Sequence, residues 1–293
     1  MIREYVLSKT IEEAVGILTK NNGNAMVVSG GTDLAVDLRS ESVKTEVLVD
    51  VTRIEGLKGI TFDDGDVIIG ASATMSEIST DERIKTSVSS LAKAAGSVGS
   101  VQIRNVATMA GNIVKAQPVA DSSVMLVALG AEITIRGTHE LKDILVQDAY
   151  ITVGKSVVDP RKEIITKIKF KKPQKNQGTS FVRLSQRKAL ATPVINVGAM
   201  VSVKDNTIEW ARIAMAPVDV KPVRATEAEN FLIGKIPTEN VFKEAGSLAV
   251  NNAKPVTHLV WGSKEYKLAV LPSLVARSLQ EAIDEIETKG GMS

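Results

Sequence analysis

Two short segments of the sequence combine glycines with side chains that can bind anions. The first is VVSGGTDL, made of Val27, Val28, Ser29, Gly30, Gly31, Thr32, Asp33 and Leu34. Glycine permits positive φ and close approach of the backbone to a ligand. Successive N–H groups in such a turn form an anion-binding concavity. Thr32 adds a hydroxyl donor, and a helix start after it would favour anions further. This chemistry suits a pyrophosphate.

The second segment, TMAGN, has a similar composition. It consists of Thr108, Met109, Ala110, Gly111 and Asn112. The hydroxyl and amide side chains could donate to phosphate oxygens, while the small residues permit close approach. Neither segment is a G-x-G-x-x-G or P-loop motif. The first segment alone also fits an ordinary tight strand-to-helix turn with Asp33 as a helix cap. Two such loops in one domain, however, could clamp a diphosphate from two sides.

The composition limits what chemistry the side chains of these 293 residues can do. There is no cysteine, and the histidines are His139 and His258. Disulfides, cysteine-bound iron–sulfur clusters and the commonest zinc sites are therefore excluded within this sequence. Neither histidine lies in a G-x-S-x-G context. We expect no catalytic side chain and no metal ligand here, so redox chemistry would require an organic cofactor.

The charge balance and hydropathy indicate an ordinary globular protein. Lys and Arg number 36 against 34 Asp and Glu, which gives a net charge of +2. Such a balance does not suggest nucleic-acid binding. No apolar run reaches the roughly 18 residues that a transmembrane helix needs. The segment MIREYVLSKT lacks the apolar centre of a signal peptide, so we expect no membrane insertion and a cytoplasmic location.

Apolar periodicity predicts alternating helices and strands in the first 175 residues. Helices are expected at residues 10–20, 89–99 and 121–130. Strands are expected at residues 25–28, 46–51, 66–71, 131–137 and 163–170. Thr-x-x-Glu capping boxes occur at Thr10–Glu13, Thr74–Glu77 and Thr226–Glu229. Residues 100–121 fit neither period, so we expect a loop there, either flexible or ordered around something.

The remaining residues predict a second domain. The basic, proline-broken run KKPQKNQG at 171–178 is the best linker candidate. After it, strands are expected near 180–187, 195–204 and 208–218, and helices near 226–233, 238–252 and 269–287. Strands interleaved with helices favour an α+β or α/β fold.

The order of several motifs resembles that of a known family. The motifs are VVSGGTDL, VGSVQIRNVATMAGNI, PVAD, FVRLSQRKALATPVINVGAMV, ARIAMAPVDVKPVRATEAENFLIGK and WGSKEYKLAVLPSLVARSL. Together they resemble the FAD-binding medium subunit of the xanthine dehydrogenase family, the molybdenum hydroxylases. The resemblance implies an α+β chain. Residues 1–175 would form a PCMH/vanillyl-alcohol-oxidase-type FAD-binding domain of two α/β subdomains. Residues 178–287 would form a smaller α+β domain, an antiparallel sheet plus helices, like the CO dehydrogenase flavoprotein C-terminal domain.

The resemblance also assigns roles to individual residues. Residues 27–34 and 108–112 would hold the FAD pyrophosphate, and Gly99 would line the cofactor. Asp121 would bind an FAD hydroxyl in the adenosine or ribityl region, and Ile165 would be an apolar contact. Arg183 would lie near the flavin, where a cation stabilises the reduced, anionic form.

The implied activity is electron transfer within a larger complex. 2Fe-2S clusters would sit on a small partner subunit and the molybdopterin cofactor on a large one. Electrons would pass through the clusters to this chain's FAD and then to NAD⁺ or another acceptor. Purines, other N-heterocycles, aldehydes and carbon monoxide are candidate substrates of the large subunit. The alternatives are a self-contained flavoenzyme of the same fold with its own small-molecule substrate, and a non-catalytic module without FAD.

Overall fold

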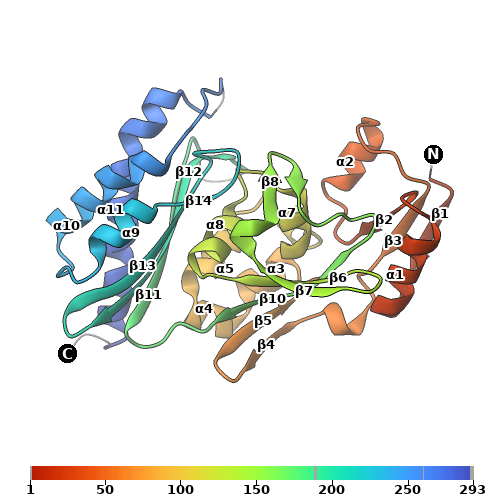
Figure 1. Ribbon diagram of the computed structural model, residues 1–293, viewed down its shortest axis with the longest axis horizontal. Coiled ribbons are helices and arrows are strands. Elements are labelled where there is room, and N and C mark those ends of the chain that lie inside the picture. Colours follow the sequence, from red (N-terminus) through yellow and green to blue (C-terminus); the bar gives the residue numbers. More distant parts are fainter. Residues whose placement is uncertain (1, 188–189, 260, 291–293) are drawn as a thin grey trace. The chain divides into compact units, whose positions relative to one another are not determined.

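The computed structural model describes residues 2–187, 190–259 and 261–290 (Figure 1). The chain divides into two compact units, each assembled from separate segments. Unit 1 comprises Met1–Ile78, Ser100–Gln117 and Ala131–Phe170, and unit 2 comprises Ser79–Gly99, Pro118–Gly130 and Lys171–Ser293. Three stretches of the first 175 residues, 79–99, 118–130 and 171–175, therefore belong to unit 2. The predicted domain ranges, residues 1–175 and 178–287, stay predictions.

Unit 1 begins with a parallel sheet of three strands in the order β1-β3-β2. These strands are β1 (Glu4–Leu7), β2 (Ala25–Val28) and β3 (Val47–Asp50), with α1 (Ile11–Lys20) and α2 (Leu34–Arg39) between them. The Thr10 hydroxyl accepts a hydrogen bond from the Glu13 N–H and caps α1 as predicted, but the Glu13 carboxylate accepts from the Lys9 N–H instead of completing the capping box at Thr10. The strand expected at 25–28 is also confirmed, so the first glycine segment begins where a largely buried strand ends.

A second sheet in unit 1 has the order β4-β5-β10-β6-β7. Its strands are β4 (Ile60–Asp63), β5 (Asp66–Gly70), β6 (Glu132–Arg136), β7 (Leu141–Leu145) and β10 (Ile164–Lys171). The smaller elements nearby are η1 (Glu55–Leu57), η2 (Val146–Ala149), β8 (Tyr150–Thr152) and β9 (Lys155–Ser156). Asp64 and Gly65, both at positive φ, join β4 to β5 in a tight hairpin. The strands predicted at 66–71, 131–137 and 163–170 are confirmed.

The segment 100–121 is not the loop that its sequence suggested. It contains α6 (Val101–Arg104) and α7 (Met109–Lys115), and Asp121 already begins α8 (Asp121–Ala128). The Ser100 hydroxyl accepts from the Ile103 N–H and so caps α6, and Thr108 caps α7 in the same way. Helices of one or two turns are too short to produce a readable apolar period, which is why the prediction failed.

Unit 2 is built on an antiparallel sheet in the order β11-β12-β13-β14. Its strands are β11 (Gln177–Ser185), β12 (Pro193–Lys204), β13 (Thr207–Ala216) and β14 (Val223–Arg224). The helices α9 (Thr226–Leu232), α10 (Glu239–Ala249) and α11 (Lys264–Thr288), together with η3 (Val250–Asn252), follow (Figure 1). The long C-terminal helices and this sheet share one apolar core, whose members include Ile195, Val197, Phe242 and Leu279.

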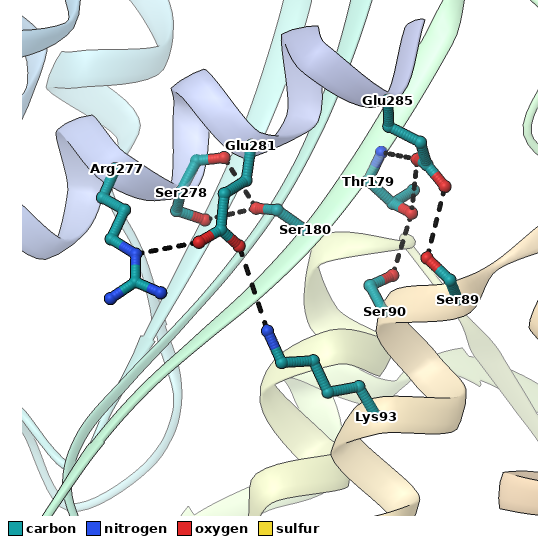
Figure 2. A network of polar contacts seen from close by, with 9 residues as sticks. All are labelled: Ser89, Ser90, Lys93, Thr179, Ser180, Arg277, Ser278, Glu281 and Glu285. Atoms are coloured by element: carbon teal, nitrogen blue, oxygen red, sulfur yellow. Dashed lines mark hydrogen bonds and ion pairs between the residues drawn. The ribbon is translucent and has the colours of Figure 1, made fainter. Parts of the chain in front are cut away.

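Helices from early in the sequence complete unit 2. They are α3 (Met75–Thr80, shared with unit 1), α4 (Glu82–Ser87), α5 (Ser89–Gly96) and α8. Figure 2 shows the polar contacts that join α5 to β11 and α11. The Ser90 hydroxyl donates to Thr179 Oγ1 at 2.8 Å, and Glu285 accepts from the Thr179 N–H at 2.5 Å. Gly178 lets α11 approach β11, since a Cβ there would lie 1.8 Å from the Ala282 carbonyl oxygen.

The third predicted capping box is wrong. The Glu77 carboxylate accepts from the Thr74 N–H as expected, but Glu229 is buried and points to β13 and β14 instead. It accepts from the Ile213 N–H at 2.7 Å and from Arg224 Nε at 2.8 Å. Glu229 of this Thr-x-x-Glu sequence therefore belongs to a buried ion pair with Arg224 instead of a capping box. The local sequence does not reveal this difference. In the part of the chain that the structure describes, no helix has the length and apolarity needed to span a membrane.

Candidate cofactor site

The two glycine segments meet in unit 1. An ideal Cβ on Gly30 would lie 2.0 Å from the carbonyl oxygen of Val106, two residues before the second segment. Only glycine allows this approach of the two backbones. Gly31 has φ +66°, in the left-handed region, so the chain turns sharply just before α2. An ion pair of 2.6 Å between Lys115 and Asp37 further joins α7 to α2.

The first segment offers hydrogen-bonding groups without internal partners. The Ser29 hydroxyl oxygen is buried and has no hydrogen-bond partner among the described residues. Within that same part of the chain, no hydrogen bond is donated by the backbone N–H groups of Gly30, Gly31, Thr32, Asp33 and Leu34. Asp33 occupies the N-cap position of α2, but its side chain makes no capping bond. A buried unpaired hydroxyl costs about 1–3 kcal/mol, so this segment fits an anionic ligand such as a diphosphate.

The second segment has a mixed role. The Thr108 oxygen accepts from the Gly111 N–H at 3.1 Å, which leaves its hydroxyl hydrogen for another acceptor. Met109 is fully buried and Ala110 nearly so, whereas Gly111 is exposed. The Met109 and Ala110 side chains thus pack into the core of unit 1, and the exposed backbone around Gly111 is the part able to face a ligand.

The other predicted residues are spread over both units. Ile165 is buried in β10 of unit 1, opposite Ile135 of β6. Gly99 lies in unit 2 after α5, with φ +50°. Asp121 and Arg183 also belong to unit 2, on α8 and β11. Unit 1 therefore contains both glycine segments and the apolar residue, and unit 2 contains the charged ones.

Asp121 and Arg183 form a buried ion pair. Arg183 Nε donates to Asp121 Oδ1 at 3.0 Å, and Asn196 Nδ2 donates to the same oxygen at 2.6 Å. Only 6% of Asp121 is exposed. Burial raises the pKa of Asp121, while Arg183, Asn196 and Ser97 act in the opposite direction. Much of the Arg183 charge is thus compensated inside unit 2.

Sequence reasoning did not reveal this pairing or the part that Asn196 plays. Arg183 and Asn196 stand directly opposite each other in the β11–β12 register, and Asp121 reaches them from a helix 62 residues before Arg183. Side chains paired across antiparallel strands lie on the same face of the sheet. A correct β11–β12 alignment would have placed Asn196 beside Arg183, but no local signal points to Asp121.

Comparison with known proteins agrees with the motif order. Residues 1–173 match the family model described as the FAD binding domain in molybdopterin dehydrogenase. The chain belongs to the FAD-binding subunits of the molybdenum hydroxylases. Residues 180–282 match the CO dehydrogenase flavoprotein C-terminal domain. The subunit thus has an FAD-binding domain followed by a flavoprotein C-terminal domain, and it is part of an oxidoreductase.

Individual relatives support this membership over most of the chain. The nicotinate dehydrogenase FAD-subunit of Eubacterium barkeri is 30% identical over 238 residues, covering 79% of each chain. The xanthine dehydrogenase FAD-binding subunit of Escherichia coli O157:H7 is 24% identical, covering 95% of each. A carbon monoxide dehydrogenase structure from Hydrogenophaga pseudoflava superposes with a TM-score of 0.91 at 24% identity, covering 97% of this chain and 98% of that one. This likeness establishes the fold.

Proposed function

We propose that this subunit passes electrons from iron–sulfur clusters of a partner chain to an acceptor such as NAD⁺, using noncovalently bound FAD. FAD supplies the redox chemistry, because a flavin takes up electrons singly and releases them in pairs. The backbone donors at Gly30–Leu34, which have no partner among the described residues, carry the proposal together with the buried Ser29 hydroxyl beside them. Such donors match phosphate oxygens.

We assign specific tasks to this chain's residues. Residues 27–34 and 108–112 bind the diphosphate through backbone N–H groups and the hydroxyls of Ser29, Thr32 and Thr108. Asp121 accepts a hydrogen bond from an FAD hydroxyl, and Gly99 and Ile165 make close or apolar contacts. Arg183 orients Asp121 through their ion pair and adds positive potential near the flavin. No side chain of this chain needs to act as an acid or base.

The partners follow from the chemistry that the chain lacks. With no cysteine, it has no thiolates to hold an iron–sulfur cluster. We therefore propose a small subunit with 2Fe-2S clusters and a large subunit with the molybdopterin cofactor, where the substrate is hydroxylated. Relatives named as FAD subunits or medium chains of dehydrogenases support a subunit role.

Flavin binding tests the assignment of the glycine segments. The purified chain should have the visible spectrum of a flavin, and acid precipitation should release all of it. Gly31→Val, at a positive φ, and Gly111→Val, whose Cβ would lie 3.0 Å from Thr108 Oγ1, should lose FAD while circular dichroism stays that of a folded protein. Gly16→Ala, with nothing within 4 Å of the added Cβ, should retain it. Full flavin content in either valine variant would refute the assignment.

Electron transfer needs a separate test. After anaerobic reduction, the flavin of the intact complex should be reoxidised by NAD⁺ in a stopped-flow experiment. The chain purified without partners and free of molybdenum should not reduce dyes with purines, nicotinate or aldehydes. Substrate-dependent dye reduction by the chain alone would instead indicate a self-contained flavoenzyme.

A further inference from the structure

Asn196 lies at a place where the sheet otherwise presents apolar or small residues. Its strand, β12, is buried from Pro193 to Val203. Asn196 shares a face of the sheet with Gly198, because residues two apart in a strand point the same way. A Cβ on Gly198 would meet Met125 Sδ at 2.9 Å, so this face packs against α8. Asn196 therefore faces the helix that begins with Asp121.

Of the two polar atoms of the Asn196 carboxamide, only the nitrogen forms a hydrogen bond with the described residues. Nδ2 donates to Asp121 Oδ1 at 2.6 Å. Oδ1 is buried and has no hydrogen-bond partner among the described residues, and the whole residue is fully buried. Leaving an amide oxygen unpaired in the interior is unfavourable. An apolar side chain of similar volume would avoid this cost, so packing alone does not explain an asparagine here.

The hydrogen bond to Asp121 explains why an asparagine stands at position 196. Arg183 Nε and Asn196 Nδ2 both bind Asp121 Oδ1, so that oxygen is held by two donors. The carboxylate is thereby fixed at the first turn of α8, in one orientation. The unpaired Oδ1 of Asn196 is the cost of aiming the carboxamide at Asp121.

We propose that Asn196 is a positioning residue for FAD binding: its carboxamide orients the Asp121 carboxylate toward the FAD hydroxyl. This rests on the proposed function, in which Asp121 contacts FAD. Asn196 does not touch the cofactor and acts only through Asp121.

Titration of the flavin-depleted full chain with FAD, followed by flavin fluorescence, tests this role. Asn196→Leu removes the donor and nearly preserves the volume. We expect its FAD dissociation constant to rise about tenfold, which corresponds to about 1.4 kcal/mol. Met200→Leu, on the same strand and face, is the control and should leave the constant unchanged. Should Asn196→Leu fail to fold, Asn196→Ser takes its place in the same measurements.

A double-mutant cycle separates positioning from mere stability. If Asn196 acts through Asp121, then Asn196→Leu has no further effect on FAD affinity in an Asp121→Asn background. Equal effects in both backgrounds would overturn the proposal, and so would unchanged FAD affinity in either single variant. Wild-type chain that does not bind FAD would instead refute the proposed function itself.

Discussion

The glycine segments of unit 1 and the Asp121 cluster of unit 2 are opposite kinds of polar site. The first segment presents an unpaired hydroxyl and backbone donors that form no bonds within the described chain. In the cluster, Asp121 is already bonded to Arg183 and Asn196. In the proposed function FAD supplies what the segments lack, whereas the cluster is organised beforehand. Changes in the two regions should consequently affect binding and stability in different proportions.

The largest effect is expected at Gly30, where the two glycine segments meet. Gly30→Val would place a Cβ 2.0 Å from the Val106 carbonyl oxygen. We expect the free energy of unfolding to fall by more than about 4 kcal/mol, at the exceptional end for one substitution, with complete loss of flavin. Urea unfolding and flavin content measure both. Gly16→Ala should be neutral or stabilising by up to about 1 kcal/mol. A stable, flavin-containing Gly30→Val protein would show that the backbones do not meet as described.

Breaking the ion pair should cost stability even without flavin. Arg183→Met leaves the Asp121 carboxylate buried without its cation, which should lower the free energy of unfolding by about 3 kcal/mol. Arg183→Lys keeps the charge and should recover part of the loss. Urea unfolding of flavin-free protein is the measurement. A loss below about 1 kcal/mol would contradict this expectation. It would show that the Asp121–Arg183 ion pair adds little to the stability of the flavin-free protein.

The pH dependence of stability should reveal the burial of Asp121. Its pKa is raised, chiefly by burial, so above pH 3.8 the folded chain retains this proton longer than the unfolded chain does. The Asp121 contribution to the free energy of unfolding therefore falls as pH rises through the folded-state pKa. Relative to wild type, Asp121→Asn should therefore become more stable as pH rises above 3.8, as measured by urea unfolding.

Asp81 provides a control of opposite sign for this pH experiment. A hydrogen bond from Arg83 lowers the pKa of Asp81, so its stabilising contribution is present above the ordinary Asp range and is lost as pH falls. Asp81→Asn should therefore lose stability relative to wild type as pH rises from 3 to 5. Parallel trends in the two variants would contradict the burial argument for Asp121.

The smallest effect, and the most selective, is expected at Ser29. Without FAD, Ser29→Ala removes an unpaired buried hydroxyl, so stability should be unchanged or higher by up to about 1 kcal/mol. With FAD, one hydrogen bond is lost and affinity should fall about tenfold. Ser180→Ala is the matched control, since that hydroxyl donates to the Ser278 carbonyl at 2.7 Å (Figure 2). It should destabilise the protein by about 1 kcal/mol without changing FAD affinity.

Local patterns in the sequence predicted the elements that local forces determine. The β2 strand, the Thr10 cap of α1 and the glycine pair were readable because β-branched runs, N-cap hydroxyls and glycine act within a few residues. Gly31 does adopt a positive φ, the conformation that glycine permits. The family and its FAD domain were also predicted, through the order of motifs along the chain.

The structural features that the sequence did not predict depend on contacts between segments far apart in the chain. Glu229 leaves its expected cap because Arg224 and β13 offer a buried partner. The Asp121–Arg183 pair depends on a helix meeting a strand 62 residues away. The assignment of α5 to unit 2 likewise depends on β11 and α11, which it meets through Ser90 to Thr179 and Lys93 to Glu281 respectively.

The segmented make-up of unit 2 has a consequence for biosynthesis. Ser89 and Glu285, which are hydrogen-bonded, are 196 residues apart. At a translation rate of roughly 5–20 residues per second, α5 waits about 10–40 s for α11 to be made. Throughout that interval the nascent chain displays Leu91, Val124 and Met125, all fully buried in the finished protein. Co-expression of a chaperone that binds exposed apolar segments should therefore increase the yield of folded protein.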